Sequence, residues 1–94
     1  MITAIVFVQA DVARIPEVAE EIAALDGISE VYSVTGEIDL IVLVRVRTHE
    51  EVADVVADRL NKVPGVIRTE PHIAFRTYSR HDLEAAFALG SDSE

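Results

Sequence analysis

The chain repeats one pattern twice, and this internal repeat restricts the fold more than any other feature of the sequence. Residues 4–8 and 41–45, which are apolar except for Arg45, each precede a helical pattern, and the helical patterns end in glycine-containing turns at 25–28 and 63–66. Each half therefore predicts a strand, a helix, a glycine turn and a second strand. Two such halves predict a βαββαβ order. This is a ferredoxin-like α+β sandwich, in which one antiparallel sheet carries both helices on one face.

Apolar residues recur at helical spacing in both predicted helices. Pro16 suits the first turn of the first helix, and Gly27 suits its left-handed end. Thr48 and Glu51 match a capping box in which Glu51 reaches back to Thr48, and the Pro-Gly pair at 64–65 ends the second helix. The predicted inner faces contain Ile15, Val18, Ala19, Ile22 and Leu25 in the first helix, and Val52, Val55, Val56, Leu60 and the stem of Arg59 in the second.

The β-type runs include a hairpin and a strand with a proline. Residues 29–47 predict the hairpin, with its polar break at 35–37. The first strand, residues 1–10, and the third are apolar without alternation, so we expect both of their faces to be buried. The last strand is predicted over 66–78. Pro71 cannot donate to a strand ladder, which indicates an edge position or a bulge.

Two helices can cover only one face of such a sheet, so the other face would expose apolar side chains to water. Large exposed apolar patches usually mark interfaces. We therefore expect a homodimer of the dimeric α/β barrel type, with sheet packed on sheet about a two-fold axis. The alternative is that residues 81–89, a short amphipathic helix, cover the face. The predicted interface residues are Ile5, Phe7, Val42 and Val44.

Composition restricts the class of partner. The 94 residues fit one small domain and contain 17 acidic and 8 basic residues, with a net charge of −9. A nucleic-acid surface needs clustered Lys and Arg, and an anionic membrane also repels an acidic protein. The absence of cysteine excludes disulfides and thiolate metal sites. The N-terminus lacks the basic region of a signal peptide, and its apolar run is too short to span a bilayer. We therefore expect a soluble, cytoplasmic protein.

The hairpin turn contains the most suggestive polar residues of the chain. Gly36 supplies the backbone freedom that a tight reversal needs. Asp39 places a carboxylate just past the turn, where the second strand of the hairpin begins. One interpretation is a solvated residue that ends a turn, because Asp is a common turn residue. The other is a carboxylate that faces a ligand beside free backbone amides of the turn.

These landmarks resemble the Lrp/AsnC family of transcriptional regulators. Residues 31–41 are similar to that family's hairpin signature, in which Thr-Gly-x-x-Asp precedes a hydrophobic residue. Residues 63–66, followed by Arg68 and Thr69, match its second landmark. The resemblance covers residues 1–79. More specifically, the sequence resembles the family's C-terminal effector domain, which is called the RAM module (regulation of amino-acid metabolism).

The resemblance implies an oligomeric sensor. Family members dimerise through their sheets and form larger rings, octamers or similar, with amino-acid effectors in clefts between dimers. Residues 1–79 would be the ligand-binding and oligomerisation domain, and 80–94 a short helix and acidic tail. Without a helix-turn-helix, the chain resembles a stand-alone module that modulates transcription by joining a full-length relative. The effector-site residues implied are Thr35, Gly36, Glu37, Ile38, Asp39, His72 and Ala74.

Patterns typical of enzymes are weaker. The three histidines have no metal-ligand spacing, and no Ser or Cys has a nucleophile signature. Glu70 and His72 share one face of a strand and could form an acid–base pair. We expect a protein that is not an enzyme and has no cofactor or metal. The alternatives are a cofactor-free oxygenase or isomerase, which the ferredoxin-like fold also supports, and an assembly module without a ligand.

We predict that these 94 residues alone do not bind duplex DNA specifically. The net charge of −9 gives phosphates no favourable surface. A gel-shift titration at physiological salt should show no sequence-dependent complex. Nanomolar binding that distinguishes one duplex from another would contradict the prediction.

Overall fold

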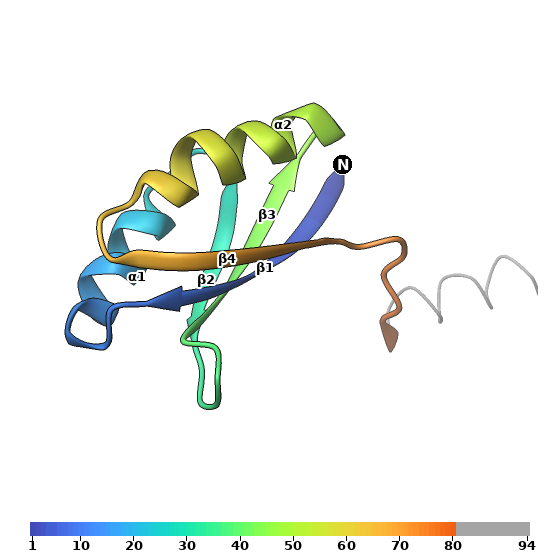
Figure 1. Cartoon of the computed structure of the whole chain (residues 1–94). Helices are drawn as coiled ribbons and strands as arrows, with labels where there is room; N and C mark the ends of the chain where they lie inside the picture. The colour runs from blue at the N-terminus through green and yellow to red at the C-terminus, as the bar shows by residue number, and fades with distance from the viewer. Residues whose placement is uncertain (81–94) are drawn as a thin grey trace, which may run out of the picture.

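The computed structural model describes residues 1–80 of the chain and consists of a four-stranded antiparallel sheet with helices packed on one face (Figure 1). The strand order is β2-β3-β1-β4, so the predicted ferredoxin-like α+β fold is confirmed. The helix predicted over 81–89 lies outside the described residues. The strands are β1 (Ile2–Ala10), β2 (Ile28–Ser33), β3 (Leu40–Val46) and β4 (Val66–Ile73).

The helices differ in regularity. A short 3₁₀ helix, η1 (Val12–Arg14), leads into α1 (Ile15–Ala23). The second helix starts as α2 (His49–Ala53), widens into a π-helical stretch, η2 (Asp54–Arg59), and ends as the 3₁₀ helix η3 (Leu60–Lys62). Among the described residues, no helix is long and apolar enough to cross a membrane.

The start of α2 confirms the predicted cap with one change. The Thr48 hydroxyl accepts a hydrogen bond from the backbone N–H of Glu51 at 3.1 Å. The Glu51 carboxylate accepts from the N–H of Arg47 at 3.2 Å, one residue before the predicted Thr48. Arg59 is exposed instead of lining the inner face, and its guanidinium donates a hydrogen bond to the carbonyl of Asp26 at 2.9 Å.

The two central strands bury one face completely and the other only in part. Side chains alternate along a strand, so every second residue of β1 and β3 faces the helices. Within the single protomer, the side away from the helices is partly exposed, so the predicted burial of both faces would require a partner sheet. The core below the helices contains Ala4, Val6, Val8, Ala10, Leu40, Val42, Val44, Val46, Val18, Ile22, Val52, Val55, Val56, Leu60 and Val63.

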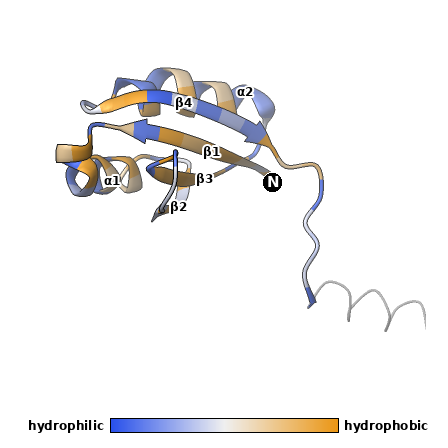
Figure 2. Ribbon diagram, turned by 60° about the horizontal axis from the view of Figure 1, so that its bottom comes forward, coloured by the Kyte–Doolittle hydropathy of each residue, from blue (hydrophilic) through white to orange (hydrophobic). Residues whose placement is uncertain are grey.

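The sheet face without helices, here called the uncovered face, has an apolar centre. Phe7 lies opposite Ile41, and Ile5 lies opposite Leu43, and all four side chains are partly exposed. Figure 2 colours β1 as hydrophobic over most of its length. Ile5 and Phe7 therefore lie where a partner sheet could contact them.

Val42 and Val44 do not lie on the face predicted for them. Both are predicted at a dimer interface, but they point toward the helices and are fully buried within the protomer. Their sequence neighbours Ile41 and Leu43 occupy the uncovered face instead. The run is apolar at every position, so hydrophobicity alone does not indicate which alternate residues face the helices.

Each glycine turn packs against the helix of the other half. Gly27 has φ 91° and Gly65 has φ 99°. A Cβ atom on Gly27 would lie 2.7 Å from Cγ2 of Val55, in the second half. A Cβ atom on Gly65 would lie 2.6 Å from Cγ2 of Val18, in the first half. Both positions therefore exclude a side chain on steric grounds as well as by their φ angles.

The carbonyl groups of the same glycines also cross between the halves. The Gly27 carbonyl accepts a hydrogen bond from the N–H of Arg45 at 2.9 Å. The Gly65 carbonyl accepts one from the N–H of Asp11, just past β1, at 2.8 Å. Two equivalent hydrogen bonds thus join the first half of the repeat to the second.

Strand β4 forms one edge of the sheet, which confirms the position predicted from Pro71. The strand ends at Ile73, earlier than the predicted residue 78. The irregular segment after it continues the contact with β1 through one hydrogen bond, from the N–H of Ala74 to the carbonyl of Thr3 at 2.9 Å.

Glutamate substitutions should separate folding from association. Val44→Glu places a charge in the core and should destabilise the protomer by about 4 kcal/mol or more, enough to unfold a small domain. Phe7→Glu adds a charge to the partly exposed uncovered face, so the fold should survive, and the dimer expected from the sequence should dissociate. Circular dichroism and sedimentation velocity measure the two effects. A folded Val44→Glu variant, or an unfolded Phe7→Glu variant, would contradict this assignment of faces.

Candidate functional site

The connection between β2 and β3, residues 34–39, is held against the end of β1. The backbone N–H of Asp39 donates to the carbonyl of Val8 at 3.0 Å, and the Asp39 Oδ2 atom accepts from the N–H of Ala10 at 2.8 Å. The N–H of Val34 closes the loop on the Asp39 carbonyl at 3.1 Å. Asp39 therefore extends the β1–β3 pairing and fixes the position of this loop, here called the β2–β3 loop.

A shallow pocket of about 200 Å³ lies where the β2–β3 loop meets β1 and β4. The side-chain amide of Gln9 donates to the carbonyl of Glu37 at 3.4 Å, which links one wall of the pocket to another. The pocket opens beside the apolar centre of the uncovered face. This loop pocket is lined by Phe7, Gln9, Glu37, Ile38, Arg68 and Glu70.

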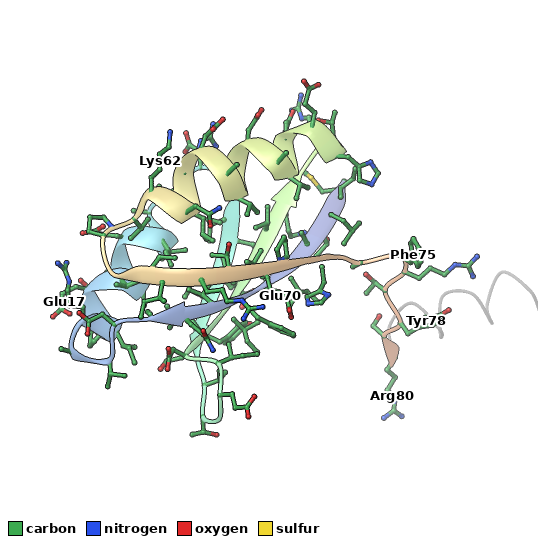
Figure 3. The ribbon with its side chains drawn as sticks, viewed as in Figure 1. Glu17, Lys62, Glu70, Phe75, Tyr78 and Arg80 are labelled. Carbon is green, nitrogen blue, oxygen red and sulfur yellow. The ribbon has the colours of Figure 1, made fainter. Side chains whose placement is uncertain are left out.

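The loop pocket combines both signs of charge with an apolar wall. Arg68 and Glu70 lie opposite Gln9 and Phe7 on the same face of β4 (Figure 3 labels Glu70, midway along the strand). Among residues 1–80, Arg68 forms no ion pair. Such a pocket can take a ligand that has an anionic and a cationic group close together.

Glu70 already has one partner. Its Oε2 atom lies 3.0 Å from Nε2 of His72, and the His72 ring stacks at a tilt on Phe7, with ring centroids 4.9 Å apart. Glu70 and His72 therefore share a face, as the alternation predicted. Both side chains are about half exposed, at 55% and 51%.

The structure brings together only part of the predicted effector site. Glu37 and Ile38 line the loop pocket, whereas Thr35 and Gly36 form the exposed tip of the loop. Asp39 does not line the loop pocket, and its carboxylate accepts a hydrogen bond from the N–H of Ala10. Of the two interpretations of Asp39, the contacts support a structural role for one of its carboxylate oxygens.

The two predicted residues at the far end of β4 lie away from the loop. Ala74 pairs with Thr3, and the strand between Thr3 and Gln9 is about 20 Å long at ~3.3 Å per residue. His72 lies opposite Ile5, between these ends. Ala74 therefore cannot share a ligand with the loop of its own protomer.

Sequence reasoning missed Gln9 and Arg68 as pocket residues, and considered Glu70 only as an acid–base partner of His72. The alternation of polar residues at 68, 70 and 72 was the available signal, because period two places them on one face of a strand. Within residues 1–80, no group of three His, Cys, Asp or Glu side chains could hold a metal ion.

The opposite edge of the uncovered face is also polar. On β2, the Tyr32 hydroxyl donates a hydrogen bond to the Glu30 carboxylate, and this bond raises the pKa of Tyr32 above its ordinary value of 10.0. With Arg68 and Glu70 on the other edge, the apolar centre has a polar rim on both sides, an arrangement typical of protein interfaces.

Comparison with known proteins gives one family. The model of the Lrp/AsnC ligand binding domain matches residues 3–83. An uncharacterized HTH-type transcriptional regulator of Pyrococcus horikoshii is 43% identical over 61 residues, which cover 65% of this chain and 41% of the regulator. The chain thus spans less than half the length of this curated relative.

Solved structures share the fold over most of the chain. TTHA0845 from Thermus thermophilus is 46% identical, with a TM-score of 0.79, and the match covers 85% of this chain and 100% of that one. A transcriptional regulator from Neisseria meningitidis, solved as a complex with L-Met, is 17% identical, with a TM-score of 0.74, over 84% of this chain and 53% of that one. The second likeness concerns the fold alone.

The role of Asp39 can be tested by two substitutions. Asp39→Ala removes the acceptor for the Ala10 N–H and should cost about 1–3 kcal/mol of unfolding free energy. Asp39→Asn keeps an oxygen at that place and should cost less. Urea unfolding gives the free energies, and amide hydrogen exchange at Ala10 reports the bond itself. Equal protection of the Ala10 amide in wild type and Asp39→Ala would show that the carboxylate does not hold the loop.

Proposed function

Because the chain belongs to the Lrp/AsnC ligand binding domain family, we propose that it is an amino-acid-binding and oligomerisation module that modulates transcription through regulators with which it associates. The curated relatives that match it are named as HTH-type transcriptional regulators. One protein of the same fold is described as a complex with L-Met. These comparisons support regulation as the class of function and an amino acid as the class of ligand.

The loop pocket is the observation that carries the proposal. An α-amino acid has a carboxylate and an ammonium group on adjacent atoms. Arg68 would take the carboxylate, and Glu70 or Glu37 would take the ammonium group, since charge-assisted hydrogen bonds are the strongest available at such a surface. Phe7 and Ile38 would contact the ligand side chain. A volume of about 200 Å³ suits a small ligand of this kind.

Association would use the uncovered face. Its apolar centre at Ile5, Phe7, Ile41 and Leu43, with polar residues on both edges, is suited to a second copy packed about a two-fold axis. Phe7 belongs both to this centre and to the loop pocket. Ligand binding and sheet packing would therefore influence each other, because both change the surroundings of the same ring.

Larger assemblies would need contacts beyond the uncovered face, because a surface that pairs about a two-fold axis closes as a dimer. His72 and Ala74 would complete a ligand site only across protomers, since Ala74 pairs with Thr3 at the end of β1 away from the loop. A ring of dimers, an octamer or similar, supplies such contacts. A full-length Lrp/AsnC regulator with a similar sheet face could replace one protomer and would carry the ligand signal to DNA.

We predict that an amino acid stabilises the protein through Arg68. At about one hundred times its dissociation constant, the ligand should add roughly 2.7 kcal/mol of stability, visible as a higher melting temperature across an amino-acid panel. Arg68→Gln should weaken binding roughly ten- to a hundredfold, the loss expected for about 1.5–3 kcal/mol of charge-assisted hydrogen bonding. Native mass spectrometry with the same panel gives ligand and subunit stoichiometry together.

Arg47→Gln is the matched control, because Arg47 is exposed outside the loop pocket and its removal should leave affinity unchanged. Equal weakening in both variants would indicate a general charge effect instead of a site at Arg68. If no amino acid changes the melting temperature or the assembly of the wild-type protein, the module has no such ligand and only its assembly role remains.

A further inference from the structure

A second pocket lies at the end of the sheet where β3 stops and α2 begins (Figure 1). It measures about 300 Å³ and is here called the end pocket. The loop pocket lies at the opposite end of β3, a strand that is about 20 Å long at ~3.3 Å per residue. The two pockets share no residue. The charged residues that line the end pocket are Asp26, Arg45, Arg47, Glu51, Asp54 and Arg59.

Arginine is concentrated at the end pocket. Three of the eight basic residues of the chain line it, although the protein has a net charge of −9. Within residues 1–80, none of these three arginines forms an ion pair with the acidic residues beside them. The guanidinium groups of Arg45 and Arg47 also have no hydrogen-bond partner in that part of the chain. Their donors are therefore available to a ligand.

Hydrogen bonds hold two walls of the end pocket together. The backbone N–H of Arg45 donates to the carbonyl of Gly27 at 2.9 Å, which joins the end of β3 to the turn before β2. The guanidinium of Arg59 donates to the carbonyl of Asp26 at 2.9 Å, which ties the second helix to the same turn. A guanidinium has five N–H donors, so Arg59 keeps most of them for a ligand. Arg59 is thus already positioned at the pocket.

The π-helical stretch η2 supplies the helix wall of the end pocket. Asp54, Val55 and Arg59 all belong to this stretch and line the pocket. Arg59 lies there instead of on the inner face that α-helical spacing predicts for it. π-Helical turns are rare and are frequently found at functional sites. The irregular part of the second helix therefore coincides with the cluster of arginines.

The arrangement of charges restricts the ligand. A phosphate group carries up to two negative charges and three strong acceptor oxygens, which match several guanidinium donors better than one carboxylate does. The carboxylates of Asp26 and Asp54 are exposed and have no partner among residues 1–80. They can accept hydrogen bonds from hydroxyl groups, and they repel a second anionic group. The pocket therefore suits one phosphate group joined to a neutral, hydroxylated body.

We propose that the end pocket binds a small hydroxylated phosphate monoester of the sugar-phosphate type. Arg45, Arg47 and Arg59 bind the phosphate group, and Asp26 and Asp54 accept hydrogen bonds from the hydroxyl groups. This ligand differs in chemistry from an amino acid, and its site lies at the other end of β3 from the loop pocket. The proposal therefore goes beyond the sensor function proposed above.

Binding and its location can be measured together by amide NMR. Ribose 5-phosphate, glucose 6-phosphate and glycerol 3-phosphate are the probes, and ribose and inorganic phosphate are the partial ligands. At least one monoester should shift the amide signals of Gly27 and Arg45 in a saturable way and leave Gly36, at the tip of the β2–β3 loop, unchanged. Inorganic phosphate should bind more weakly than that monoester, and ribose should cause no shift.

Substitutions assign the two halves of the ligand. Arg45→Gln and Arg59→Gln should each weaken monoester binding roughly ten- to a hundredfold, and Arg59→Lys should weaken it less. Asp54→Ala should weaken monoester binding but strengthen binding of inorganic phosphate, because it removes an acceptor and a negative charge together. These side chains are exposed, so the variants should remain folded, which circular dichroism checks.

Arg14→Gln is the matched control, because Arg14 is exposed and lines neither pocket. It should bind the monoester as the wild-type protein does, and equal weakening in Arg14→Gln and Arg59→Gln would overturn the proposal. The proposal also fails if no monoester shifts Gly27 at millimolar concentration, if inorganic phosphate binds as tightly, or if the shifts centre on Gly36. The titrations contain no amino acid, so these failures would leave the proposed ligand of the loop pocket unaffected.

Discussion

Two contacts between a glycine and a valine determine where the outer strands of this sheet begin. Gly27 lies against Val55 and Gly65 against Val18, each across the boundary between the two halves. The next residue after each glycine opens a strand, β2 in the first half and β4 in the second. A side chain on either glycine would push a turn away from the opposite helix and shift the strand that follows. The two halves therefore cannot pack independently of each other.

This constraint also positions the polar rim of the uncovered face. Glu30 and Tyr32 are on β2, and Arg68 and Glu70 are on β4, all within a few residues of the glycine turns. The rim residues on β4 form part of the loop pocket, which needs β1, β4 and the β2–β3 loop in register. The candidate ligand site thus depends on the same packing that holds the helices on the sheet. Substitutions in the core near the glycine turns would therefore alter the shape of the loop pocket.

The repeat was enough to predict the fold, but not the orientation of the central strands. Helix spacing and glycine turns are local signals, and they identified both helices. The missing N–H of Pro71 is also local, and it indicated an edge position or a bulge for β4, of which the edge position is confirmed. Val42 and Ile41 are equally apolar, so only the completed pairing with β1 shows that Val42 faces the helices. The hydrogen bond from Ala10 to Asp39 likewise joins residues far apart in the chain. No local pattern could indicate it, and the same holds for Arg68 as a neighbour of the loop.

The proline in β4 has a consequence for how copies of the protein meet. An outer strand normally presents a row of N–H and C=O groups on which another strand can add, and unlimited addition produces fibrils. Pro71 interrupts that row, because its ring nitrogen carries no hydrogen. An apolar sheet face makes this protection useful, because two such faces in contact would also bring the sheet edges close together. Pro71 thus disfavours open-ended addition of strands at the β4 edge.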